Sequence, residues 1–233
     1  MAIAKNIEQV RKAIAEAATL AARDPASVQL LAVSKTFDAG AVIDAADAGQ
    51  LAFGENYLQE ALDKQQAAKS LRPDLALEWH FIGPIQSNKT RPIAEHFSWA
   101  HTVDREKIAR RLSEQRPAGM PPLNICLQVN VSGEASKSGV APEELTALAQ
   151  VVAMLPNLRL RGLMTIPEPT DDLAAQRQPF AILRGLQQQL KARGIEMDTL
   201  SMGMTADMQA AIAEGATIVR IGTAIFGKRN YAE

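Results

Sequence analysis

A lysine stands at the end of an apolar run, where a desolvated amine can do chemistry. Lys35 follows the run 28–34 and shares its strand parity with Leu31 and Val33. If its amine faces the core, the charged form is disfavoured and the neutral amine can form a Schiff base with an aldehyde. The alternative is a lysine that snorkels to solvent at a strand end, and Lys35 taken alone favours that alternative.

Two segments near the C-terminus have the composition of an anion pocket. The first runs from Ser201 through Gly203 to Thr205, and the second contains Gly222 and Thr223. Glycine N–H groups and serine or threonine hydroxyls can surround a phosphate at a helix N-terminus. Each segment alone could be an ordinary turn, since these residues dominate turns. Together they favour a phosphate site.

Arg220 lies between apolar neighbours, two residues before Gly222 and on the same strand face. A charge in such surroundings needs a partner. A carboxylate is one candidate, and the ring nitrogen of a bound pyridine is the other. Because arginine does not give up its proton, it would keep that nitrogen unprotonated, and the ring would be a poor electron sink.

Other chemistries are less well supported. Residues 83–90 miss the phosphate-loop pattern GxxxxGK[ST], since Asn88 replaces a glycine, and we interpret them as a strand-to-helix loop. The histidines His80, His96 and His101 have no HxH or HExxH spacing, so no metal site is predicted. Lys plus Arg is 25 and Asp plus Glu is 26, which does not indicate a nucleic-acid partner.

A repeating pattern of strands and helices must position these residues. An amphipathic helix with Ile3, Ile7, Val10 and Ile14 on one face comes first. Eight short apolar runs then alternate with helical patterns, at residues 28–34, 51–54, 79–83, 98–103, 124–130, 158–166, 199–204 and 217–226. Such alternation requires parallel strands, and eight units predict a single (β/α)8 barrel with an extra N-terminal helix, over an open doubly wound sheet. In a closed barrel the loops after strands seven and eight usually hold phosphate.

Composition also bounds the location and size of the protein. The single cysteine, Cys126, lies in an apolar run, and no apolar stretch reaches the ~18 residues of a membrane span. The N-terminus has no basic region followed by an apolar run. We therefore expect one cytoplasmic domain over residues 1–233.

Five blocks of the sequence resemble the pyridoxal phosphate homeostasis protein family, at residues 31–35, 53–57, 80–89, 200–204 and 219–227. They are similar, more distantly, to the barrel domain of alanine racemase. The resemblance implies a fold-type III site for pyridoxal 5′-phosphate with a Schiff base on Lys35 and Arg220 facing the ring nitrogen. It implies that Ser201, Thr205, Gly222 and Thr223 hold the phosphate. Asn56 in the second block and Lys137, which matches a racemase arginine, complete the expected cofactor-binding set. Lys137 is either a second amine near the aldehyde or a solvated loop lysine.

Departures from the racemase pattern bear on the activity. The chain stops at Glu233, so we expect no β domain and no tyrosine to act as the second acid/base of racemisation. The absence of a positioned acid or base should lower the rate of racemisation ~10²- to 10⁴-fold. Ile166 stands where the racemase places a histidine. The resemblance therefore implies a non-catalytic or weakly catalytic, monomeric carrier of pyridoxal phosphate that serves vitamin B6 homeostasis and supplies apo-enzymes. The alternatives are an amino-acid racemase and a barrel enzyme in which Lys35 attacks a phosphorylated ketone.

Overall fold

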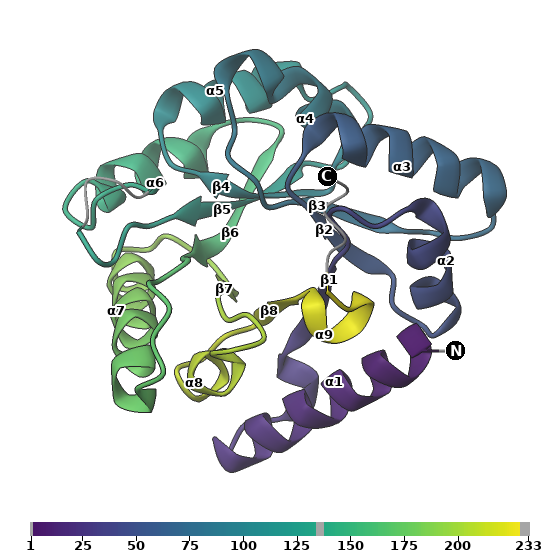
Figure 1. Cartoon of the computed structure of the whole chain (residues 1–233). Coiled ribbons are helices and arrows are strands. Elements are labelled where there is room, and N and C mark those ends of the chain that lie inside the picture. Colours follow the sequence, from purple (N-terminus) through teal and green to yellow (C-terminus); the bar gives the residue numbers. More distant parts are fainter. Residues whose placement is uncertain (1, 134–137, 229–233) are drawn as a thin grey trace.

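The computed structural model describes residues 2–133 and 138–228, and its centre is a closed barrel of parallel strands. The strands follow the order of the sequence around the barrel, as Figure 1 shows. They are β1 (Gln29–Val33), β2 (Ala52–Glu55), β3 (Glu78–Phe81), β4 (Trp99–Val103), β5 (Leu123–Gln128), β6 (Leu158–Met164), β7 (Thr199–Ser201) and β8 (Ile218–Ile221). Each of the eight predicted runs overlaps one of these strands, although β2 extends one residue past its run and β3 and β5 begin one residue before theirs. The predicted (β/α)8 barrel is confirmed.

Strand parity divides the core into two parts. Leu31 and Val33 of β1 belong to a cluster inside the barrel, together with Trp99 and Ile218. Leu30 and Ala32, the alternate residues of the same strand, pack in the larger cluster outside it. This is the alternation that a pleated strand imposes when both of its faces are buried.

Helices surround the barrel (Figure 1). Their apolar side chains pack in the outer cluster. Asp38 and Asp172 cap two of the helices by accepting hydrogen bonds from the N–H groups of Ala41 and Ala174. The helices are α2 (Ala39–Asp47), α3 (Leu58–Leu71), α4 (Thr90–His96), α5 (Glu106–Gln115), α6 (Leu145–Met154), α7 (Leu173–Ala192), α8 (Met208–Ala213) and α9 (Thr223–Phe226), with 3-10 turns at Pro25–Ser27 and Ser87–Lys89. None of the described helices is long and apolar enough to cross a membrane.

The N-terminal helix α1 (Ala2–Leu20) completes the outer ring. It packs against α2, α8 and α9 (Figure 1). Since α9 has only 4 residues, α1 covers the outer face that a full-length helix after β8 would cover. Its apolar face is buried at Ile7, Val10 and Ile14, and Asn6 donates a hydrogen bond to the carbonyl of Ile225 (2.8 Å).

The predicted run 217–226 is wrong in its second half. Strand β8 ends at Ile221, and Thr223–Phe226 form α9. The apolar residues after Gly222 had suggested a continuing strand, but Ile225 is buried in the outer core as part of a helical turn. An apolar run this short does not distinguish a strand from a buried helical turn.

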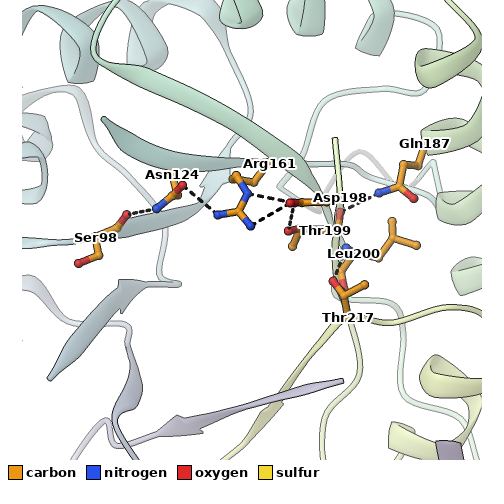
Figure 2. Close-up of polar contacts among 8 residues, drawn as sticks. All are labelled: Ser98, Asn124, Arg161, Gln187, Asp198, Thr199, Leu200 and Thr217. Carbon is orange, nitrogen blue, oxygen red and sulfur yellow. Dashed lines mark hydrogen bonds and ion pairs between the residues drawn. The ribbon is translucent and has the colours of Figure 1, made fainter. Parts of the chain in front are cut away.

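The floor of the barrel, at the N-terminal ends of the strands, is closed by polar contacts that converge on Arg161. Its guanidinium donates to Asn124 Oδ1 (3.1 Å) and to both carboxylate oxygens of Asp198 (2.9 and 3.0 Å), as Figure 2 shows. The same guanidinium lies 4.5 Å from the ring centroid of Trp99, inside the barrel. The floor therefore has a structural role, which is usual for this face of a barrel.

Candidate functional site

Lys35 and the loop after β8, which we call the Gly222 loop, lie at the same rim of the barrel, the one formed by the C-terminal ends of the strands. Strands β1 and β8 are parallel neighbours, with Leu31 opposite Arg220. Gly222 packs so closely against β1 that a Cβ atom there would lie 3.1 Å from the carbonyl oxygen of Val33. Lys35 follows Val33 by two residues and is half-buried. The amine-bearing residue and the predicted anion loop therefore begin from adjacent strand ends.

The backbone turn that presents Lys35 is strained and held by hydrogen bonds. Thr36 has a φ of 69°, a left-handed conformation that is unfavourable for a β-branched residue. Its N–H donates to Glu60 Oε1 of α3 (2.6 Å), and the N–H of Phe37 donates to the carbonyl of Ser34 (3.1 Å). Strain of this kind persists only where the surroundings enforce it.

A buried ionic cluster supports this turn from the outer side of the barrel wall. We define the Lys64 cluster as Lys64, Glu55, Glu60 and Ser34. Lys64 Nζ donates to Glu55 Oε1 (2.6 Å), to the Ser34 carbonyl (2.7 Å) and to Glu60 Oε1 (3.0 Å). The hydroxyl of Ser34 donates to Glu55 Oε1 (2.5 Å). The side chains of Lys64 and Glu55 are 3% and 0% exposed, so this ion pair is shielded from water.

Asn56 provides a buried polar atom that a ligand could satisfy. It follows β2, and its side-chain Oδ1 is buried with no hydrogen-bond partner among the described residues. Gly83 packs against its backbone, because a Cβ at Gly83 would lie 2.2 Å from the Asn56 carbonyl oxygen. A buried acceptor without a partner costs about 1–3 kcal/mol, which a donor on a bound molecule would offset.

Arg220 lies inside the barrel, with 4% of its surface exposed. It donates hydrogen bonds to Ser201 Oγ (2.8 Å) and to the carbonyl of Thr165 (3.1 Å). Within the described residues no carboxylate lies at ion-pair distance, so the carboxylate partner considered from the sequence is not found there. Burial lowers the pKa of Arg220 to about 10, and the side chain remains cationic at neutral pH. A guanidinium has five N–H donors, and these two bonds leave others for a ligand.

The four predicted phosphate ligands separate into two groups. Thr205, Gly222 and Thr223 are at least partly exposed, and Thr205 lines a pocket on the outer side of the barrel wall, with Val10 of α1 and Ala224 of α9. In the described part of the chain the backbone N–H groups of Gly222 and Thr223 donate to no other residue. Ser201 is instead fully buried in the barrel and bonded to Arg220 and to His101. The Ser201 hydroxyl is thus committed inside the barrel, whereas the backbone N–H groups of Gly222 and Thr223 remain available at the end of β8.

Two further sequence predictions have different outcomes. Lys137 lies outside the described residues. Ile166, just beyond β6, is 41% exposed and supplies no acid or base there.

The structure also joins two histidines whose spacing in the sequence predicts no shared site. His80 of β3 and His101 of β4 are fully buried, with Nδ1 of the first 2.8 Å from Nε2 of the second. Burial lowers the pKa of His80 and holds the pKa of His101 well below the usual value. Glu78 lies 2.7 Å from His80 Nε2, and this contact lowers the pKa of Glu78. The signal in the sequence was parity, because Glu78 and His80 share one face of a strand.

Known proteins share both the sequence and the fold. The family model described as alanine racemase, N-terminal domain, matches residues 1–230. The pyridoxal phosphate homeostasis protein of Pseudomonas aeruginosa is 67% identical over 229 residues, covering 98% of this chain and 96% of that protein. The protein of the same name from Escherichia coli K12 is 54% identical over 235 residues, covering 99% and 98%.

Solved structures agree with these sequence matches. PipY of Synechococcus elongatus PCC7942, solved with PLP bound, superposes with a TM-score of 0.83 at 36% identity and covers 97% of this chain and 100% of PipY. Alanine racemase from Corynebacterium glutamicum has a TM-score of 0.71 at 17% identity, and the match covers 100% of this chain and 62% of the racemase. The second comparison shows the barrel fold only. By identity and coverage, this chain belongs to the pyridoxal phosphate homeostasis protein family.

Proposed function

We propose that this protein binds pyridoxal 5′-phosphate at the rim formed by β1, β2, β7 and β8, and serves vitamin B6 homeostasis as a carrier or buffer. The observation that supports this most strongly is the closeness of the Lys35 turn to the Gly222 loop on adjacent strands. The bound cofactor supplies an aldehyde carbon, which forms a C=N bond with a lysine amine and releases water. A relative at 36% identity was solved with PLP bound.

Each side chain has a role that its surroundings support. Lys35 supplies the amine, and the strained turn at Thr36 fixes its backbone. Arg220 donates toward the pyridine nitrogen, and Ser201 positions Arg220. The unpaired N–H groups of Gly222 and Thr223, with the hydroxyl of Thr205, bind the phosphate. Asn56 accepts a hydrogen bond from the bound molecule. Lys137 lies outside the described residues, and its role as a second amine rests on the family resemblance alone.

A carrier fits these residues better than a racemase does. A cationic donor at the ring nitrogen keeps that nitrogen unprotonated, which weakens the ring as an electron sink. Ile166 adds no proton donor at the rim. The curated relatives are named for homeostasis of the cofactor and not for an enzymatic activity. We further propose that residues 1–233 act as one cytoplasmic, monomeric domain that supplies cofactor to apo-enzymes.

Borohydride reduction followed by peptide mass spectrometry tests the attachment site. We expect one pyridoxyl label, on Lys35, and loss of the visible absorption band in Lys35→Ala. Lys69→Ala, which changes an exposed lysine on α3, should retain both label and band. A label on a different lysine in place of Lys35 would contradict the assignment. A colourless protein that takes up no cofactor would leave the phosphorylated-ketone alternative.

A second measurement separates the carrier from the racemase. Proton exchange at the α-carbon of alanine in D₂O should be absent or far below the rate of a racemase. Exchange at enzyme-like rates would overturn the carrier proposal.

Arg220→Glu tests the contact with the cofactor ring. The substitution should change the absorption band without abolishing binding, and an unchanged band would show that Arg220 does not meet the ring.

A further inference from the structure

A continuous line of side chains crosses the inside of the barrel from Arg220 to Glu78. Arg220 contacts Ser201 Oγ (2.8 Å), whose oxygen lies 2.7 Å from His101 Nδ1. His101 Nε2 lies 2.8 Å from His80 Nδ1, and His80 Nε2 lies 2.7 Å from Glu78 Oε1. These residues come from β8, β7, β4 and β3, so the line joins opposite parts of the barrel wall.

The two ends of this line determine which group donates and which accepts in each of its hydrogen bonds. Glu78 as a carboxylate only accepts, so His80 must carry its proton on Nε2. A neutral His80 then accepts at Nδ1, which requires the proton of His101 on Nε2. Neutral His101 in turn accepts at Nδ1 from the Ser201 hydroxyl, and Ser201 Oγ accepts from Arg220. Every donor therefore points from Arg220 toward Glu78, and no bond in the series is mismatched.

The line joins two different environments. Its three middle members, Ser201, His101 and His80, are fully buried, and the His80 ring stacks on Trp99 with centroids 5.1 Å apart. Glu78 is 44% exposed in its side chain and lines a cleft of about 560 Å³ at the floor. Arg220, at the other end, is two residues from the Gly222 loop. The line is thus sealed in the middle and meets solvent at the end remote from the rim.

We propose that Glu78, His80, His101 and Ser201 form a positioning relay that fixes Arg220 as a donor toward the cofactor ring. Through these hydrogen bonds, the negative charge of Glu78 would affect the strength of the contact between Arg220 and the ring. The inference rests on the proposed function, because it assigns the relay to the same site. Hydrogen bonds in series polarise one another, which gives a remote carboxylate an effect at Arg220. Two satisfied core histidines with a purely structural role would have no such effect on the cofactor.

Nuclear magnetic resonance of the imidazole nitrogens tests the direction of the relay in the cofactor-free protein. We expect neutral, Nε2-protonated rings for both His80 and His101, with the exposed ring of His96 as the reference signal. An Nδ1-protonated His101 would overturn the proposal, because the series would then be mismatched. This measurement does not depend on pyridoxal phosphate binding, so it can fail or succeed independently of the proposed function.

Removing the charge of Glu78 tests whether that charge affects the bound cofactor. Glu78→Gln keeps an acceptor for His80 but removes the charge, and we expect a displaced absorption band and a pyridoxal phosphate dissociation constant raised severalfold, up to roughly tenfold. Glu196→Gln is the control, since it neutralises an exposed carboxylate in the segment before β7 that is outside the hydrogen bonds of Arg161 and outside the relay. It should leave the band in place. A Glu78→Gln spectrum identical to wild type would overturn the relay, whereas a wild type without any band would instead contradict the proposed function.

Breaking the middle of the relay tests whether its members act in series. In a His101→Phe background, Glu78→Gln should cause no further change, because the signal from the floor is already interrupted. Additive effects of the two substitutions would overturn the proposal. If His101→Phe does not fold, the tautomer measurement on the wild-type protein still decides the direction of the relay.

Discussion

Removing Lys64 should destabilise the protein strongly, although Lys64 lies behind the barrel wall. Lys64→Met leaves the carboxylate of Glu55, whose side chain is 0% exposed, without its cation. Breaking a buried ion pair from one side costs about 3–5 kcal/mol, which is a large part of the ~5–15 kcal/mol that stabilises a typical domain. The carbonyl of Ser34, which accepts from Lys64 at 2.7 Å, loses a partner as well.

Urea unfolding of three variants measures the effect and its origin. We expect Lys64→Met to lose about 3–5 kcal/mol of unfolding free energy, for the reason given above. The double variant Lys64→Met/Glu55→Gln removes both charges and should recover most of that loss, because an uncompensated charge is no longer buried. Lys69→Met, on the exposed side of the same helix, should stay within ~0.5 kcal/mol of wild type.

The same variants connect stability with the site. Lys64 holds the Ser34 carbonyl directly before Lys35, so Lys64→Met should also slow the attachment of pyridoxal phosphate to Lys35. A loss below ~1 kcal/mol in Lys64→Met would refute the reasoning, because a buried pair broken from one side should cost more. Additive losses in the double variant would refute it too, since they would mean that the two side chains do not interact.

Three other perturbations follow from the structure. Gly83→Ala places a Cβ 2.2 Å from the Asn56 carbonyl oxygen, so thermal unfolding should report a loss of about 3 kcal/mol, and a variant as stable as wild type would contradict this packing. Burial lowers the pKa values of His80 and His101 in the folded protein. Below the ordinary histidine pKa of ~6.5, the unfolded chain therefore binds protons at these residues that the folded protein does not bind. Stability should therefore fall from pH 7 toward pH 5.5, by up to ~1.4 kcal/mol per pH unit for each histidine, and denaturant titrations of His101→Phe should show a smaller slope; equal slopes would contradict the assignment. Thr36→Asn should raise the unfolding free energy by about 1 kcal/mol, because asparagine tolerates the φ of 69° better than threonine does, and a less stable variant would show that the turn is not strained.

Much of the fold could be predicted because one periodicity repeats along the whole chain. Parity grouped Lys35 with Leu31 and Val33, and both of these apolar side chains lie inside the barrel. The same rule carried Lys35 and the Gly222 loop to one rim and Arg220 to the inside of the barrel, since parallel strands that are neighbours end together. The end of β8 was predicted incorrectly because Ile225 is buried in a helix as deeply as it would be in a strand.

The missed contacts depend on geometry that a single sequence does not contain. His80 and His101 meet because β3 and β4 pair with His80 opposite Trp99, and this register is set by packing around the closed barrel. Ser201 could be recognised as a hydroxyl at a strand end. Its commitment to Arg220 follows from the contact of side chains on β7 and β8 inside the barrel. Local patterns therefore identify candidate residues, and register decides which of them touch.

Two buried polar systems approach the same rim from opposite sides of the barrel wall. The Lys64 cluster supports the carbonyl before Lys35 from outside, and the relay ends at Arg220 from inside. Apolar residues of similar volume would often fill such positions with equal or greater stability, so neither system is explained by stability alone. What they have in common is that each supports one of the two basic side chains expected to meet the cofactor, Lys35 and Arg220. Buried polar residues therefore lie next to the proposed site, because fixing the orientation of Lys35 and Arg220 requires hydrogen-bond partners that a hydrophobic core cannot provide.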